Sequence, residues 1–154
     1  MDKRRVNVRA IVWRDGKVLA VKHREGDGEA QFWCIPGGGL DPHESLVDGV
    51  AREMLEETGV EVNVGKLLFI QQFESRRSGF DEELELFFHV EDTTAFDMID
   101  LATTSHGTEE IAEIAFVDQR EVKILPTFLS TIDIESYIET NKSVYLNDSF
   151  NERT

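Results

Sequence analysis

Apolar residues near the start of the chain recur at every second position, a spacing typical of β-strands with one buried face. In residues 6–12, Val6, Val8 and Ala10 alternate with Asn7 and Arg9. An Asp-Gly pair at positions 15 and 16 is a favoured hairpin turn and predicts a returning strand after it. Strands are predicted over residues 6–12, 18–21, 32–35, 60–73, 84–90 and 111–117.

Two segments have the wider apolar spacing of an amphipathic helix. The first follows the start signal Glu44–Ser45 and ends at Gly59. Its expected core face consists of Val47, Val50, Ala51, Met54 and Leu55. The second is predicted over residues 126–139, with a proline at its start. Strands and helices in this order predict an α/β fold with a mixed β-sheet between helices.

The length of the chain limits its domain organisation. A chain of 154 residues is expected to form one domain, which we assign to residues 1–140. Residues 141–154 are mostly polar and predict a C-terminal tail that the rest of the chain holds only weakly.

Composition and charge limit the compartment and the partners that we expect for the protein. The sequence has no apolar run that could cross a membrane, and its single cysteine fits a reducing compartment, so we expect a cytoplasmic protein. A net charge of −15 argues against a nucleic-acid partner. Eight of the 16 basic residues nevertheless lie among the first 24 positions. This basic segment is either a solvated face or a positive surface that meets an anionic ligand.

Three glutamates of the first helix carry the clearest chemical signal. Glu53, Glu56 and Glu57 are spaced i, i+3 and i+4, so they share one face, which we expect to lie opposite the apolar face. Carboxylates held this closely repel each other unless a cation lies between them, and oxygen ligands favour Mg²⁺ or Mn²⁺. Gly49 falls on the same face and would leave room for a ligand. The alternative is an acidic helix face exposed to water.

The surrounding residues favour the metal site. From Gly38 the chain has Glu44 after five residues, Arg52-Glu53-Met54 after seven more, then Glu56-Glu57, Gly59 and Val60. This pattern resembles the signature of the Nudix (MutT-like) hydrolases at every position. The approach Phe32-Trp33-Cys34-Ile35-Pro36-Gly37-Gly38 is also similar to that family. The resemblance implies an α/β/α sandwich and hydrolysis of a nucleoside diphosphate linked to another group, with divalent cations.

The resemblance also implies roles for individual residues. Glu56 and Glu57 correspond to the principal metal ligands, and Glu53 to a ligand, a general base or both. Glu44 and Arg52 correspond to residues that hold the helix and the preceding loop in place, and the carbonyl of Gly37 to a further ligand. Some relatives add an acidic residue from a later segment, for which the candidates are Glu110 and Glu113.

The signature determines the reaction and leaves the substrate open. A short member of the family is expected to be a nucleoside triphosphate pyrophosphohydrolase that acts on a small nucleotide. The alternatives are an ADP-ribose or other nucleotide-sugar pyrophosphatase and a catalytically silent nucleotide-binding domain. Candidate phosphate-binding residues are Arg24, Arg76 and Arg77. Whether the chain forms a homodimer stays open.

Overall fold

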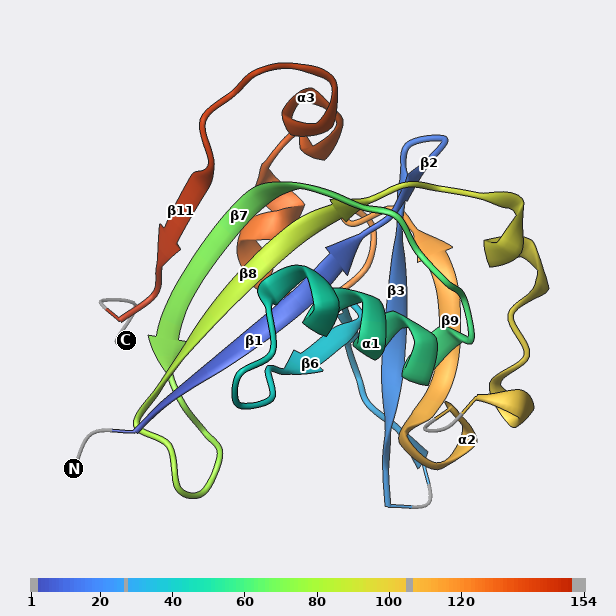
Figure 1. Ribbon diagram of the computed structural model, residues 1–154, viewed down its shortest axis with the longest axis horizontal. Helices are drawn as coiled ribbons and strands as arrows, with labels where there is room; N and C mark the ends of the chain where they lie inside the picture. Colours follow the sequence, from blue (N-terminus) through green and yellow to red (C-terminus); the bar gives the residue numbers. More distant parts are fainter. Residues whose placement is uncertain (1–2, 27, 105–106, 151–154) are drawn as a thin grey trace.

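The computed structural model describes residues 3–26, 28–104 and 107–150, and its strands form two sheets that pack face to face (Figure 1). The first sheet has the order β11-β7-β8-β1-β6. Its strands are β1 (Arg4–Ile11), β6 (Gly37–Gly39), β7 (Val64–Glu74), β8 (Glu82–Val90) and β11 (Tyr145–Asp148). The second sheet contains β2 (Trp13–Arg14), β3 (Lys17–Glu25), β4 (Gly28–Glu29), β5 (Trp33–Cys34), β9 (Ile111–Val117) and β10 (Ile124–Leu125).

Helical elements lie outside the two sheets. Helix α1 (Leu46–Thr58) packs against β1 and β6. The other helical segments are short: η1 (Thr94–Met98), η2 (Leu101–Thr103), α2 (Gly107–Glu110), η3 (Thr127–Thr131) and α3 (Ile134–Glu139). None of the helices in the described ranges is long and apolar enough to cross a membrane.

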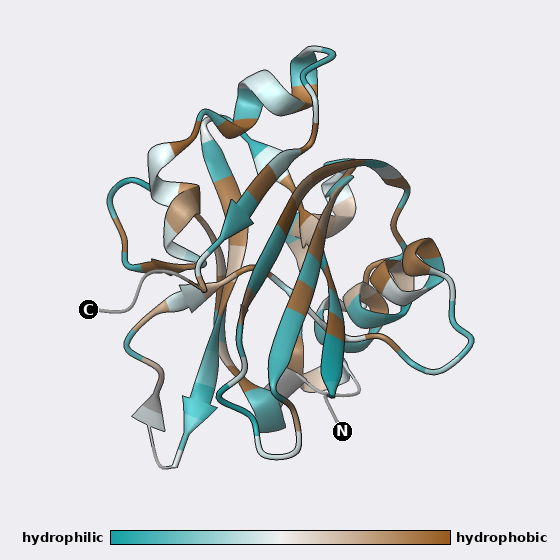
Figure 2. Cartoon of the chain, turned by 90° about the vertical axis from the view of Figure 1, so that its left-hand side faces the viewer, coloured by the Kyte–Doolittle hydropathy of each residue, from teal (hydrophilic) through white to brown (hydrophobic). Residues whose placement is uncertain are grey.

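Strand β1 connects the two halves of the core because its residues alternate between two apolar clusters. Ile11 packs between the sheets in a cluster that includes Phe69, Phe87 and Leu129. On its other face, Val8 packs beneath α1 in a cluster that includes Met54. Figure 2 shows the resulting alternation of hydrophilic and hydrophobic residues along the strands. The predicted α/β class and mixed sheet are therefore confirmed: β1 runs parallel to β8 and antiparallel to β6.

The predicted C-terminal elements need two corrections. Residues 126–139 form η3 and α3 instead of one helix, because Asp133 caps a new helix by accepting a hydrogen bond from the Ser136 N–H. The segment expected to be a weakly held tail contains β11, which pairs in parallel with β7. Tyr145 of β11 stacks on Phe128 at a centroid distance of 5.5 Å, so burial of its ring helps to hold the strand. Residues 151–154 of the predicted tail lie outside the described residues.

Helix α1 has the predicted ends, and Val50 and Met54 of its expected core face are buried. The Ser45 hydroxyl accepts a hydrogen bond from the Asp48 N–H, and Gly59 ends the helix with a φ of 75°. Val47 and Leu55 are 47% and 48% exposed, whereas Glu57 is only 5% exposed. The expectation that the carboxylates lie opposite the core is therefore wrong, since Glu57 turns toward β6 and the protein interior.

Candidate metal and phosphate site

Two carboxylates of α1 lie directly against the first two glycines of β6. The Gly37 N–H donates a hydrogen bond to Oε2 of Glu57 over 3.1 Å. A Cβ atom placed on Gly38 would lie 2.7 Å from Oε1 of Glu53, so a side chain there would displace this carboxylate. Gly37 itself has a φ of +146°, and a Cβ on it would lie 2.1 Å from the Val8 carbonyl oxygen. The glycine run thus permits close contact between backbone and carboxylates.

Gly49 has a different role from the one expected. A Cβ on Gly49 would lie 2.6 Å from a methyl carbon of Leu40 and 3.2 Å from one of Val8. The residue therefore permits close packing of α1 on β1 and the preceding loop, and it does not open space for a ligand.

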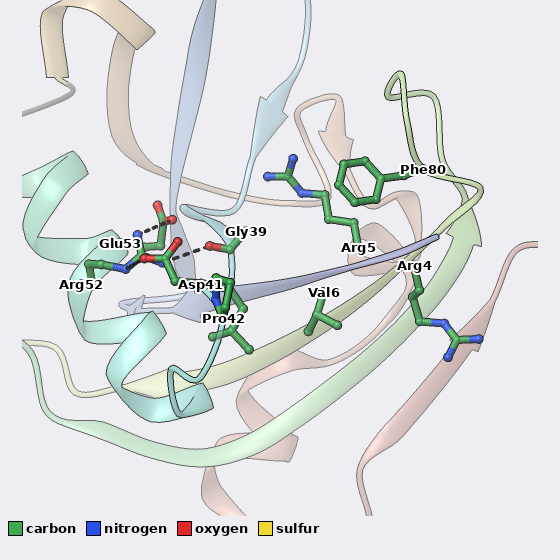
Figure 3. Close-up of a pocket in the computed structure, with 10 residues that line it drawn as sticks. Arg4, Arg5, Val6, Gly39, Asp41, Pro42, Arg52, Glu53 and Phe80 are labelled. Atoms are coloured by element: carbon green, nitrogen blue, oxygen red, sulfur yellow. Dashed lines mark hydrogen bonds and ion pairs between the residues drawn. The ribbon is translucent and has the colours of Figure 1, made fainter. Parts of the chain in front are cut away.

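Arg52 organises the outer side of this cluster (Figure 3). Its Nε and one terminal nitrogen donate to the two carboxylate oxygens of Glu44, over 2.7 and 2.8 Å. The same terminal nitrogen donates to the Gly39 carbonyl, and the other donates to Glu53 and Glu56 over 3.0 and 3.2 Å. Arg52 therefore ties the loop before α1 to two of the three predicted metal ligands, as expected for a positioning residue.

Their surroundings raise the pKa of Glu57 and Glu53 and lower that of Glu44. Burial, together with the nearby charge of Glu53, raises the pKa of Glu57 to about 8. Burial also raises the pKa of Glu53. Hydrogen bonding to Arg52 lowers the pKa of Glu44. Glu44 is thus held as a carboxylate, whereas Glu57 becomes a carboxylate readily only when positive charge approaches it.

The donor set fits a hard divalent cation, because three carboxylates within one helical turn offer only oxygen. Within residues 3–26, 28–104 and 107–150, no three acidic, histidine or cysteine side chains converge on one point. Two of the carboxylates have an alternative partner, since Glu53 and Glu56 both accept from Arg52. A bound cation would compete with Arg52 for these oxygens and with a proton for Glu57.

A hollow of about 550 Å³ opens beside the carboxylates, and we call it the carboxylate hollow. The predicted site residues that line it are Gly37, Glu53, Glu56, Glu57, Arg24, Arg77 and Glu110. Arg76 and Glu113 are exposed and do not line it, and Glu113 faces Lys22 across β3 and β9. Of the two later acidic candidates, only Glu110 therefore reaches the site.

Three residues whose side chains line the hollow were not predicted: Arg5, His23 and Glu109. Arg5 belongs to the basic N-terminal segment, of which only Arg24 was predicted to bind phosphate. Burial and the nearby charge of Arg9 lower the pKa of His23, which favours its neutral form. The hollow is therefore lined by both carboxylates and arginines.

Buried polar groups lie between the sheets beside this hollow. Glu85 accepts from Arg9 over 2.5 Å and from Gln71 over 3.1 Å, while Asn7 donates to Glu83 over 3.0 Å. All of these side chains except Arg9 are at most 6% exposed. Gln71 in turn accepts a hydrogen bond from Asn147 of β11, so the C-terminal strand is connected to this network.

Comparison with known proteins agrees with the geometry. The family model described as the NUDIX domain matches residues 3–137. The chain is 37% identical over 67 residues to the CTP pyrophosphohydrolase of Escherichia coli K12, an alignment that covers 44% of this chain and 50% of that protein. It is 42% identical over 55 residues to the RNA pyrophosphohydrolase of Rhizobium meliloti, covering 36% and 32% of the two. The chain thus spans half or less of the length of these curated relatives.

Two solved structures have the same fold. A MutT NUDIX hydrolase from Burkholderia pseudomallei superposes with a TM-score of 0.66 at 20% identity, covering 87% of this chain and 98% of that one. A MutT protein from Methanosarcina mazei Go1 superposes with a TM-score of 0.67 at 24% identity, covering 92% and 98%.

Proposed function

The chain belongs to the Nudix hydrolase family, and we propose that it is a Mg²⁺- or Mn²⁺-dependent nucleoside triphosphate pyrophosphohydrolase. It would release a nucleoside monophosphate and pyrophosphate. The observation that carries this proposal is the contact between the carboxylates of α1 and the glycines of β6, at the edge of a hollow lined by arginines.

In this proposal, Glu53, Glu56 and Glu57 would hold the cation together with the carbonyl of Gly37. When bound, the cation neutralises charge on the polyphosphate and makes the attacking water more acidic. Arg52 and Glu44 keep Glu53 and Glu56 in position through the hydrogen bonds described above. Glu53 is the candidate base, because its carboxylate lines the hollow beside Gly38. Glu110, on another wall of the hollow, is the candidate additional acidic group.

Two observations favour a nucleoside triphosphate. The curated relatives include a CTP pyrophosphohydrolase and a putative 8-oxo-dGTP diphosphatase of Bacillus subtilis, the latter 35% identical over 72 residues. Arg24 and Arg77 line the carboxylate hollow, where they could balance phosphate charge that the cation leaves unneutralised. Retention of every signature carboxylate also argues against a silent nucleotide-binding domain.

A nucleotide panel tests the proposal. The purified protein would be incubated with Mg²⁺ and each common ribo- and deoxyribonucleoside triphosphate, alongside ADP-ribose and UDP-sugars. For the triphosphates, phosphate would be measured with and without inorganic pyrophosphatase. For the nucleotide sugars, it would be measured after alkaline phosphatase, which releases phosphate from the two monophosphate products. We expect phosphate from one or more triphosphates only when pyrophosphatase is present. Cleavage of nucleotide sugars alone would contradict the proposed substrate, and no turnover of any compound would contradict the proposed activity.

A further inference from the structure

Arg5 lies at the boundary between two hollows. Besides the carboxylate hollow it lines a second one of about 630 Å³, the outer hollow, whose other lining residues include Leu40, Pro42 and Phe80. The two hollows share Arg5, Gly39 and Glu53. Figure 3 shows the Arg5 side chain extending from β1 between Phe80 and Gly39 of β6. A linear ligand that starts at the carboxylates and continues outward would therefore pass Arg5.

The fold restrains the Arg5 side chain along its length. Its Nε donates to the Asn7 side-chain oxygen over 2.7 Å, and its guanidinium carbon lies 5.9 Å from the centre of the Phe80 ring. A Cβ on Gly39 would lie 2.9 Å from one terminal nitrogen, so this glycine leaves space for the guanidinium.

Arg77 approaches the same place from the loop between β7 and β8. Arg5 and Arg77 share one buried carboxylate, since Oε1 of Glu83 lies 3.8 Å from Nε of Arg5 and 3.5 Å from Nε of Arg77. Two positive charges thus face a single negative one. Burial and the charge of Arg77 lower the pKa of Arg5. The loop is anchored where Asp81 exchanges hydrogen bonds with the backbone of Lys3.

We propose that Arg5 and Arg77 form a clamp for a phosphate group that lies beyond the carboxylate cluster, and that this clamp makes the site prefer nucleoside triphosphates over diphosphates. The inference rests on the proposed function and adds to it how phosphate number is recognised. The guanidinium of arginine presents paired N–H groups that match two phosphate oxygens, whereas the ammonium group of lysine has no such pair. The clamp would hold the additional phosphate of a triphosphate between Arg5 and Arg77, both of which line the carboxylate hollow.

Binding measurements test the clamp without turnover. Isothermal titration calorimetry with excess Mg²⁺ would compare α,β-methylene analogues of ATP and ADP, and of CTP and CDP, on wild type, Arg5→Gln, Arg5→Lys and Arg77→Gln. Arg120→Gln is the matched control, because Arg120 is exposed and lines neither hollow. We expect Arg5→Gln to weaken triphosphate binding roughly tenfold, the effect of one charge-assisted hydrogen bond, and diphosphate binding less than twofold. Arg77→Gln should act in the same direction, and Arg5→Lys should recover only part of the loss.

A purely structural role for Arg5 would give a different result. If Arg5 only neutralised Glu83, its substitution would lower the melting temperature and leave the ratio of triphosphate to diphosphate affinity unchanged. An unchanged ratio, or a wild type that binds no triphosphate, would overturn the clamp. Failure of the proposed function is distinguishable, because a protein that hydrolyses no triphosphate could still show this change in binding ratio.

Discussion

Replacing Glu57 by glutamine should stabilise the metal-free protein, although it removes a predicted metal ligand. Glu57 is 5% exposed, and its pKa rises from an ordinary value of 4.5 to about 8. Each tenfold change in an ionisation equilibrium is worth about 1.4 kcal/mol, so the folded protein disfavours the ionised form by about 5 kcal/mol. Glutamine has the same shape and can still accept the hydrogen bond from the Gly37 N–H.

The sign of the pH dependence follows from this shift. Below its ordinary pKa, Glu57 is protonated in both the folded and the unfolded protein, so it does not make the free energy of unfolding depend on pH. As the pH rises toward 8, the unfolded chain loses the proton while the folded protein keeps it, so wild type loses stability. Glu57→Gln lacks this loss. Its stability advantage should grow by about 3–4 kcal/mol between pH 5 and pH 8, and saturating Mg²⁺ should reduce it because a cation favours the carboxylate.

Urea unfolding followed by circular dichroism, with EDTA present, measures this difference at each pH. Glu61→Gln is the control, because Glu61 is exposed and lies outside the carboxylate hollow. Its difference from wild type should not change over the same pH range. A free-energy difference between wild type and Glu57→Gln that is constant with pH would refute the assignment of Glu57 as a desolvated carboxyl group.

Four other predictions concern the site. EDTA should abolish hydrolysis, and excess Mg²⁺ or Mn²⁺ should restore it; turnover that persists with the chelator would contradict a metal-dependent reaction. Arg52→Lys, which loses the paired contact with Glu44, should lower kcat at least tenfold and raise the Mg²⁺ concentration needed for half activity, both measurable in a metal titration. Gly38→Ala should lower kcat at least tenfold by displacing Glu53, whereas Gly28→Ala, whose Cβ would meet nothing closer than 3.8 Å, should not. Arg24→Ala should raise KM roughly fivefold with little change in kcat; a KM equal to that of wild type would exclude Arg24 from phosphate binding.

The sequence predicts the local part of the site well. Glu53, Glu56 and Glu57 could be placed together because a helical period alone brings positions three and four apart onto one side. Both ends of α1 could also be predicted, because Ser45 and Gly59 act on backbone groups of their own helix. These features depend on contacts within about 15 residues of chain.

The features that were missed depend on contacts between distant segments. The buried face of α1 includes Glu57, because the helix packs on β6 and the Glu57 carboxylate accepts a hydrogen bond from the Gly37 N–H. Arg5 reaches the hollow because β1 pairs with β6 and β8, which no local pattern around residue 5 indicates. Strand β11 was missed because a short polar strand is held by its neighbour β7 and by burial of Tyr145.

The products of wild type and two matched variants test the central claim most directly. Phosphorus NMR would follow a nucleoside triphosphate incubated with Mg²⁺ and wild type, Glu57→Gln or Glu61→Gln. The account predicts nucleoside monophosphate and pyrophosphate from wild type and Glu61→Gln, and a rate at least 100-fold lower from Glu57→Gln. Release of orthophosphate with a nucleoside diphosphate, or equal rates for the two variants, would contradict it.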